Sequence, residues 1–450
     1  MAHDGLATLL GFLEVFRPAL TQPAFGNLVV LFAGWVRTTG PHAVTQALVA
    51  TAVPGRRHHE AFHRFFSRGT WDPDDLGRLL FGLALKMGGA TRAVRLAVDD
   101  TLAPKKGAHV FGIGSHLDAV RSTRLFRVFC FGHCWVMLAI LLPVPFSRRT
   151  WALPVLFRLY RNKKECEAKR HIYRKKTQLA REMLDLVVQW AGERRIEVCA
   201  DAAYCNDTVT HGLLPHVVFF GAMRPDAVLT APPPARVPKR AGRPRKRGRL
   251  LAKPEARACD QRQPWKTCKA ALYGNQKVAV RFKSYCAQWY RACGTRLLRV
   301  VVVAVPTGSI RYRVFFSTDP TLSIAQILQT YAERWAIEVC FRDLKQTMGF
   351  ADSSARKKEA VERTAPFVGF TYTSLVLWFA QHVHGTSLDT LPLRPWYEHK
   401  QGRSFADILR VAQRVLVPLN VLDPRRSLAN LQETAVIIPF PSKQRHRRTG

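Results

Sequence analysis

One segment of the chain carries four polar side chains whose spacing places them on the same edge of a helix. Steps of 3, 4 and 7 residues separate Tyr331, Arg334, Glu338 and Lys345. At about 100° per residue, these four side chains fall within roughly 60° of one another. We predict one amphipathic helix that begins at about Ser323, buried through a separate apolar stripe formed by Ile337, Cys340, Phe341 and Leu344. A phenol, a guanidinium, a carboxylate and an ammonium on one edge can hold a phosphate together with a metal ion.

A solvated charged face is the ordinary alternative for this helix. Arg334 and Glu338 form a common i,i+4 pair that contributes only about 0.2–0.5 kcal/mol. Two acids elsewhere favour chemistry, because Asp100 closes a predicted strand over 94–100 and Asp201 closes another over 196–201. Carboxylates at strand ends can converge with one from a helix. Three such oxygen ligands suit Mg²⁺ or Mn²⁺.

The chemistry expected of this set is phosphodiester cleavage. Two ions about 4 Å apart would activate a water or a 3′-hydroxyl and stabilise the leaving oxygen. Asp99 is an adjacent alternative to Asp100 as the first ligand, and strand alternation alone does not decide between them. Isolated aspartates at strand ends are also common as turn formers and helix caps.

The net charge of the chain indicates which class of partner it binds. The 450 residues include 69 Lys and Arg against 32 Asp and Glu, a net charge of +37. Such a field attracts polyanions, so DNA or RNA is expected and a membrane is not. Acidic residues at 4 and 14 argue against a secretory leader. The apolar runs 128–142 and 367–379 are too short to span a bilayer and are interpreted as a strand and a core helix. The ten cysteines are expected to be free thiols in a reducing cytoplasm.

The order of elements predicts an α/β fold with a mixed sheet. Residues 1–90 are predicted to be helical and are a candidate DNA-end-binding domain, with basic and aromatic residues mixed over 56–68; a helical subdomain with a solvated basic edge is the alternative. Strands are predicted over 94–100, 109–120, 128–142, 196–201 and 217–220, with a long basic helix over 163–190. Further strands are predicted over 278–282, 297–305 and 312–316, and the C-terminal region 351–450 is predicted to be helical with a basic tail over 443–448.

A basic, Pro- and Gly-rich insertion interrupts this order between residues 232 and 254. Charge repulsion keeps such a run open until an anion neutralises it. We therefore expect Arg243, Arg245, Lys246 and Arg247 to contact DNA, a plain solvated loop being the alternative.

The spacing Tyr331-x2-Arg334-x3-Glu338-x6-Lys345 resembles the Tyr-Arg-Glu-Lys (YREK) signature of DDE transposases of bacterial insertion sequences. The surroundings are similar too: Asp100 directly precedes Thr101, and Asp201 lies in the segment 200–204, Ala-Asp-Ala-Ala-Tyr. The resemblance covers roughly residues 92–350. It implies a ribonuclease-H-like catalytic core, here 91–230 completed by 321–350, with a basic linker and β-rich insertion domain over 231–320.

Carried over by position, the resemblance implies that Asp100, Asp201 and Glu338 bind two Mg²⁺ or Mn²⁺ ions. Tyr331, Arg334 and Lys345 would contact DNA phosphate near the cut. Some members flip a base onto an aromatic residue; Trp289 is a candidate, and a core tryptophan is the alternative. Lys105 could meet the cleaved strand, or lie in a solvated turn.

The resemblance implies a DNA transposase that binds the terminal inverted repeats of its element, cuts them and joins the 3′-hydroxyl ends to target DNA. Pairing two ends implies a homodimer in the synaptic complex. Two other functions stay open: an inactive nucleic-acid-binding relic or repressor, and another metal-dependent nuclease on the same core.

Overall fold

The computed structural model describes most of the chain. The described residues are 2–51, 57–89, 93–107, 109–123, 125–235, 243, 245–272, 276–305, 311–390, 396, 400 and 402–417. The predicted basic tail over 443–448 and part of the basic insertion, residues 236–242, lie outside these ranges.

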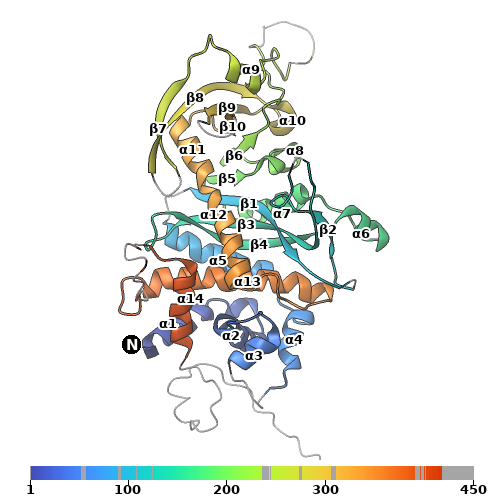
Figure 1. The fold of residues 1–450 in the computed structure, drawn as a ribbon, viewed down its shortest axis with the longest axis vertical. Helices are drawn as coiled ribbons and strands as arrows, with labels where there is room; N and C mark the ends of the chain where they lie inside the picture. The colour runs from blue at the N-terminus through green and yellow to red at the C-terminus, as the bar shows by residue number, and fades with distance from the viewer. Residues whose placement is uncertain are drawn as a thin grey trace, which may run out of the picture.

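A ten-stranded mixed sheet runs through the molecule (Figure 1). Its first half contains β1 (Val94–Pro104), β2 (Gly114–Leu117), β3 (Phe129–Pro143), β4 (Thr150–Tyr160), β5 (Ile196–Ala200) and β6 (Val217–Met223). The strands β4, β3, β1, β5 and β6 lie side by side in that order. β3 is antiparallel to both β1 and β4, whereas β5 is parallel to β1 and to β6. β5 ends at Ala200 beside Val98, whereas β1 continues to Pro104, so the end of β5 lies against the middle of β1 and the prediction that Asp100 closes its strand was wrong.

The predicted strands of the insertion continue this same sheet. They are β7 (Lys266–Leu272), β8 (Gln276–Gln288), β9 (Leu297–Ala304) and β10 (Tyr312–Ser317). β10 pairs with β6, and the order then continues through β9 and β8 to β7 at the far edge. The strands of the insertion are thus joined to the first half of the sheet by backbone hydrogen bonds between β6 and β10.

Helices cover the sheet and fill the N- and C-terminal regions. The N-terminal helices are α1 (Ala2–Glu14), η1 (Arg17–Ala19), α2 (Gln22–Arg37), α3 (Val44–Ala50), α4 (Glu60–Ser67) and α5 (Pro73–Gly88). Those between strands are α6 (Lys163–Ala168), α7 (Lys176–Ala191), η2 (Ala202–Tyr204), α8 (Asp207–Thr210), α9 (Pro254–Cys259) and α10 (Tyr290–Cys293). The last are α11 (Ile324–Glu333), α12 (Trp335–Thr347), α13 (Lys358–Trp378), η3 (Phe379–Val383) and α14 (Phe405–Leu416). One continuous apolar core includes residues from α1 to α14.

The N-terminal helices pack against the C-terminal ones. The aromatic side chains of the basic segment, Phe62, Phe65 and Phe66, are buried, and Phe66 packs edge-on against Phe367 of α13. Arg64 pairs with Glu60 at the surface. These aromatic rings are therefore part of the core, and the segment presents a solvated basic edge.

α13 is the central helix of this lower layer (Figure 1). It contains the apolar run 367–379 up to residue 378, which confirms the prediction of a core helix. Among the described residues, no helix is long and apolar enough to cross a membrane.

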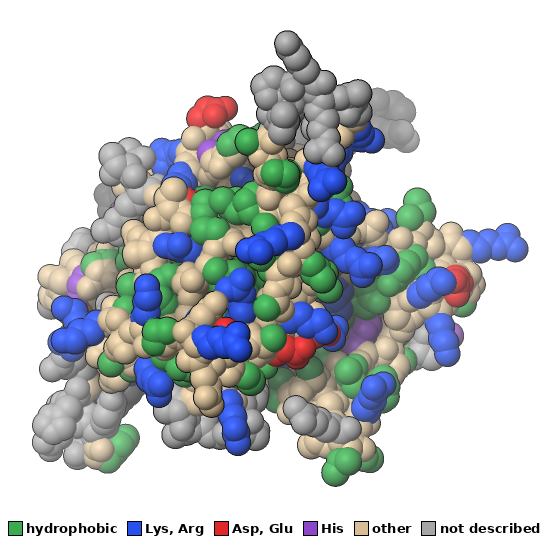
Figure 2. Space-filling model, turned by 90° about the horizontal axis from the view of Figure 1, so that it is seen from above, with side chains coloured by type: hydrophobic (Ala, Val, Ile, Leu, Met, Phe, Trp, Pro, Cys, Tyr) green, Lys and Arg blue, Asp and Glu red, His purple; other side chains and the backbone are tan. Residues whose placement is uncertain are grey.

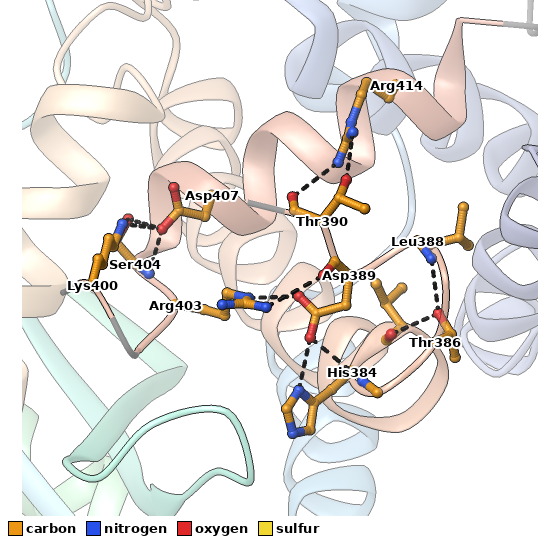
Figure 3. A network of polar contacts seen from close by, with 12 residues as sticks. His384, Thr386, Leu388, Asp389, Thr390, Lys400, Arg403, Ser404, Asp407 and Arg414 are labelled. Carbon is orange, nitrogen blue, oxygen red and sulfur yellow. Dashed lines mark hydrogen bonds and ion pairs between the residues drawn. The ribbon is translucent and has the colours of Figure 1, made fainter. Parts of the chain in front are cut away.

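A polar network fixes the connection between η3 and α14 (Figure 3). Asp389 accepts hydrogen bonds from Arg403 at 2.6 Å and from the His384 ring at 3.0 Å. Asp407, only 2% exposed, accepts hydrogen bonds from the Ser404 backbone and hydroxyl and from Lys400. Burial acts to raise the pKa of Asp407, but Lys400 and Ser404 lower the pKa to about 2. These charged bonds hold the first turn of α14.

One strand was not predicted, and one helix was predicted with the wrong extent. The segment Thr150–Tyr160 is a strand that the sequence did not predict, because Pro154 argues against a strand interior. The structure places this proline at a register shift on the edge strand β4, where a missing N–H is tolerated. The predicted helix over 163–190 is two helices, since Arg170 between them has φ of 53°.

Candidate active site

The predicted catalytic helix is interrupted at Arg334. It consists of α11 and α12, and the Arg334 N–H bonds back to Tyr331 O at 3.1 Å, which tightens the chain to an i,i+3 turn. The prediction of a single helix was therefore wrong. Its apolar stripe is confirmed, since Ile337, Cys340 and Leu344 are at most 1% exposed and Phe341 is 8% exposed. Tyr331 thus lies on α11, whereas Glu338 and Lys345 lie on α12.

The two aspartates at the middle of β1 lie on opposite faces of the sheet, because side chains alternate along a strand. Arg95 shares the face of Asp99 and bonds to Glu333 of α11 at 2.8 Å. On that face, the Asp99 Oδ2 accepts a hydrogen bond from Arg334 Nη1 at 2.8 Å. The face of Asp99 is therefore the one covered by α11 and α12.

The register between β1 and β5 brings Asp201 to the same face. Val98 lies opposite Ala200 in this parallel pair, so the next positions along the two strands are Asp99 and Asp201. In β5, the Cys199 thiol donates to the Thr330 carbonyl of α11 at 3.2 Å. Asp201, two residues later, continues that face at the strand end, where its carboxylate is exposed and caps η2.

Arg334 is the cation at the centre of these acids. Its Nη2 donates to Glu338 Oε1 at 2.9 Å, so one guanidinium bridges Asp99 and Glu338. Burial acts to lower the pKa of Arg334, but nearby Asp99, Glu338 and Asp201, together with Tyr331, raise it. Burial raises the pKa of Asp99 to about 6, against the opposing effect of Arg334. Three carboxylates therefore surround one cation on one face.

The other two residues of the signature differ in their surroundings. The Tyr331 ring packs on Phe315 with centroids 4.6 Å apart, and Arg334 lies 5.7 Å from the Tyr331 centroid. Lys345 lies two turns beyond Glu338 and is exposed. Within the described part of the chain, no hydrogen bond or ion pair engages its ammonium. Tyr331 therefore packs beside the acids, whereas Lys345 is free to meet a phosphate.

Asp100 belongs to a separate network on the other face of β1. Its Oδ2 accepts from Lys176 Nζ of α7 at 2.6 Å, and its Oδ1 accepts from the Tyr204 hydroxyl at 2.7 Å. The Cys134 thiol of β3 lies 3.4 Å from Oδ2. Tyr204 is only 1% exposed. Both carboxylate oxygens of Asp100 thus accept from protein donors, of which Tyr204 and Cys134 are buried and Lys176 is half-buried.

The donor set on the Asp99 face has the chemistry of a divalent-cation site. Asp99, Asp201 and Glu338 supply carboxylate oxygens, the ligands that Mg²⁺ and Mn²⁺ prefer. Across the described ranges, no three His, Cys, Asp or Glu side chains are close enough to hold one ion together. The Arg334 guanidinium accounts for this between Asp99 and Glu338, because it lies bonded to both. A cation bound by these two acids would therefore replace Arg334.

Lys105 does not lie free beside the acids. Its ammonium donates to the Ala351 carbonyl at 2.7 Å and to the Ser353 carbonyl. Burial lowers the pKa of Lys105 to about 8. In this arrangement, Lys105 anchors the loop after α12.

The described part of the basic insertion lies on a short antiparallel pairing. The Gly248 N–H donates to the Ala231 carbonyl at 2.9 Å, and Thr230 bridges to Leu250. The four predicted DNA contacts here, Arg243, Arg245, Lys246 and Arg247, are all exposed. Figure 2 shows the adjoining end of the molecule, where Lys and Arg side chains predominate over Asp and Glu. This surface is suited to a polyanion.

Trp289 is half-buried in the same region. Its ring packs edge-on against Phe316 at 5.5 Å between centroids, in contact with the main core. These contacts favour the alternative of a packing tryptophan over a base-binding one.

Sequence reasoning missed the residues that hold the acids in place. Lys176 and Tyr204 fix Asp100, and Arg95 joins Glu333 of α11 to Glu197 of β5. One signal was available: Arg95 and Glu197 are charged residues inside otherwise apolar strands, at the same alternation as Asp99 and Asp201. Charged residues at these alternating strand positions indicate which face of the sheet is covered by a helix with polar side chains.

Comparison with known proteins identifies the family of the chain. A family model described as DDE superfamily endonuclease matches residues 16–284. The chain belongs to this family. A second model, for the archaeal putative transposase ISC1217, matches residues 284–388, which include α11 and α12 of this DDE endonuclease. No curated protein matches its sequence. One similar solved structure is the piggyBac transposase in a synaptic complex with hairpin DNA, with 9% identity and a TM-score of 0.42; the match covers 97% of this chain and 83% of that chain.

Proposed function

We propose that this DDE endonuclease is the transposase of a bacterial insertion sequence and that Asp99, Asp201 and Glu338 are its metal ligands. The observation that carries the proposal is the convergence of these three carboxylates around Arg334 on one face of the sheet. Asp99 replaces Asp100 in this set, because the Asp100 carboxylate is on the other face and is held by Lys176 and Tyr204.

We propose a ribonuclease-H-like core for the sheet β4-β3-β1-β5-β6. In support, β1 is antiparallel to β3 and parallel to β5. The acids lie on β1, after β5 and on α12, which packs over β1 and follows α11, the helix that packs over β5. The strands β7 to β10 are inserted between Asp201 and Glu338 in the chain.

When bound, two Mg²⁺ or Mn²⁺ ions would supply an activated water or 3′-hydroxyl and stabilise the leaving oxygen. The carboxylates of Asp99, Asp201 and Glu338 would hold these ions. Arg334, displaced from Asp99 and Glu338, would present its planar fork to a phosphate of the cleaved strand. Lys345 and the Tyr331 hydroxyl would hold neighbouring phosphates.

DNA is the proposed partner along the basic surface, through Arg243, Arg245, Lys246 and Arg247. Affinity should fall steeply with salt, since each neutralised phosphate releases a counterion. Affinity unchanged between low and physiological salt would contradict this part of the proposal. We further propose that the protein binds terminal inverted repeats, forms a homodimer in the synaptic complex and is located at the bacterial nucleoid.

The test of the activity is Mg²⁺-dependent cleavage of duplexes from the two ends of the element that carries this gene. Glu338→Gln keeps the side-chain shape and removes the ligand charge, so DNA affinity should stay within about twofold while cleavage falls at least about a thousandfold. Glu359→Gln, at the start of α13, is a matched control that should cut normally. Equal cleavage by Glu338→Gln and the parent would refute the site.

Joining separates a transposase from another nuclease. The parent should attach the cut 3′ ends to a supercoiled target plasmid, with the joined product visible on a gel. Cleavage without any joined product would favour a nuclease of another kind on this core.

A further inference from the structure

The arm formed by β2, the turn after it and the start of β3 exposes an unusual set of apolar side chains. The most exposed are Leu125 at 100%, Val120 at 95% and Phe126 at 69%, all in the turn. Phe129 and Phe131 of β3 are 60% and 51% exposed. Contiguous apolar surface of this kind marks a binding site.

The turn that carries these side chains is held in one conformation. Asp118 accepts hydrogen bonds from the backbone N–H groups of Val120 and Arg121, both at 3.1 Å. The Thr123 N–H donates to the Phe126 carbonyl at 2.8 Å, and the Phe126 N–H donates to the Thr123 hydroxyl at 3.0 Å. Because the turn is already ordered, binding through Phe126 costs little conformational entropy.

The exposed face of the arm is the face of the catalytic acids. Met137 of β3 lies opposite Asp99 and shares its side of the sheet. Phe131 has the same parity as Met137 and lies six residues away, which is about 20 Å along a strand. One turn of B-DNA is about 34 Å, so one duplex can reach both the acids and the arm.

Charge decides between DNA and a second copy of the chain as the occupant. Arg127 and Lys345, both exposed, lie on the arm and on the last turn of α12. Burial acts to lower the pKa of Lys345, and the Asp118 carboxylate of the arm acts to raise it. With a net charge of +37, two copies of the DNA-free protein repel one another, whereas a polyanion is attracted to basic side chains beside the apolar ones.

We propose that Leu125 and Phe126 insert between base steps of the DNA duplex whose phosphate lies at the acids, and so kink it. The inference rests on the proposed function, because it needs that duplex at Asp99 and Glu338. Both aliphatic and aromatic wedges unstack base steps in this way, which accounts for a leucine and a phenylalanine side by side. Phe129, the first residue of β3, lies eight residues or about 26 Å from Met137, and the wedge lies up to about 10 Å beyond it, so the kink is expected roughly eight to eleven base pairs from the cut.

The test is a scan of 2-aminopurine, whose fluorescence rises on unstacking, through a duplex from the element's end. With the parent protein, fluorescence should rise at steps roughly eight to eleven base pairs from the cut and stay low elsewhere. The double variant Leu125→Ala with Phe126→Ala should lose this rise and bind about tenfold more weakly. Phe126→Leu, which keeps an apolar wedge, should retain most of the signal. Val49→Ala, at a residue 74% exposed on α3, is the control and should behave as the parent.

The outcomes separate this inference from the proposed function. If the parent cuts the duplex and the double alanine variant gives the same fluorescence and affinity, the wedge is refuted and the transposase proposal stands. If the parent neither binds nor cuts, both fail. Light scattering of the free protein covers the remaining case: a dimer that the double variant makes monomeric, with fluorescence unchanged, would show a self-association surface and overturn the inference.

Discussion

The two faces of β1 hold neighbouring carboxylates in opposite circumstances. On one face, Asp99 accepts from the Asp100 backbone N–H and, among the described side chains, from Arg334 alone, which it shares with Glu338 at the start of α12. On the other face, Asp100 accepts from Lys176 and from the buried Tyr204 hydroxyl. An acid held by several fixed donors contributes to the fold, whereas an acid held by one displaceable cation can bind a substrate or an ion. The hydrogen-bond partners of each aspartate, more than its position in the chain, determine which of the two roles it has.

The largest expected effect on stability comes from removing the charge of Asp100 from its hydrogen-bond network. Asp100→Asn removes the charge that Lys176 needs in a half-buried position and should lower the free energy of unfolding by about 3 kcal/mol. Combined with Lys176→Met, much of that loss should be recovered, because no unpaired charge remains. Urea denaturation of the two variants measures the difference. A fully stable single variant would contradict the structural role of Asp100.

Asp407, on α14, is the reference for a purely structural acid (Figure 3). Its pKa is lowered to about 2, so its stabilisation is complete above the unfolded-state pKa and is lost as the pH falls through the folded-state pKa. Asp407→Asn should therefore cost about 2 kcal/mol at neutral pH, with allowance for solvent screening. The gap between variant and parent should close between about pH 4 and pH 2. Thermal unfolding as a function of pH measures this, and a gap independent of pH would contradict the charged network.

The smallest expected effect is on the stability of the DNA-free protein when the Asp99 face is altered. Arg334→Met leaves Asp99 and Glu338 facing one another without a cation, so a divalent ion should raise the unfolding temperature of the variant more than that of the parent. A difference of about 1 kcal/mol is expected near saturating Mg²⁺. Arg342→Met, at an exposed arginine two turns further along α12, is the control. Equal stabilisation of variant and parent would argue against an ion between these carboxylates.

Much of the catalytic half of the sheet could be predicted from the sequence. The strands β1, β3, β5 and β6 follow from apolar runs bounded by acids or turns, and the apolar stripe of α12 follows from its helical spacing. These patterns are local, and burial of their apolar residues decides the structure. The break at Arg334 could not be predicted, because the chain there keeps right-handed helical angles and only its hydrogen bonds tighten.

The choice between Asp99 and Asp100 depends on tertiary structure and not on local sequence. Alternation says only that the two point to opposite faces, and the covering helix that identifies each face comes from a distant part of the chain. α11 reaches Asp99 and α7 reaches Asp100, through partners 235 and 76 residues away. Likewise, β4 was missed because a strand proline is tolerated only at an edge bulge, and neither the edge nor the bulge is visible in the sequence.

A matched pair of variants tests the central claim most directly: single-turnover Mg²⁺-dependent cleavage by Asp99→Asn and by Asp100→Asn, each at a temperature where circular dichroism shows it folded. We predict that Asp99→Asn binds DNA as the parent does and cuts at least about a thousandfold more slowly, whereas Asp100→Asn stays within about tenfold of the parent. The reverse order, with Asp99→Asn active and Asp100→Asn inactive while folded, would contradict the assignment of the catalytic face.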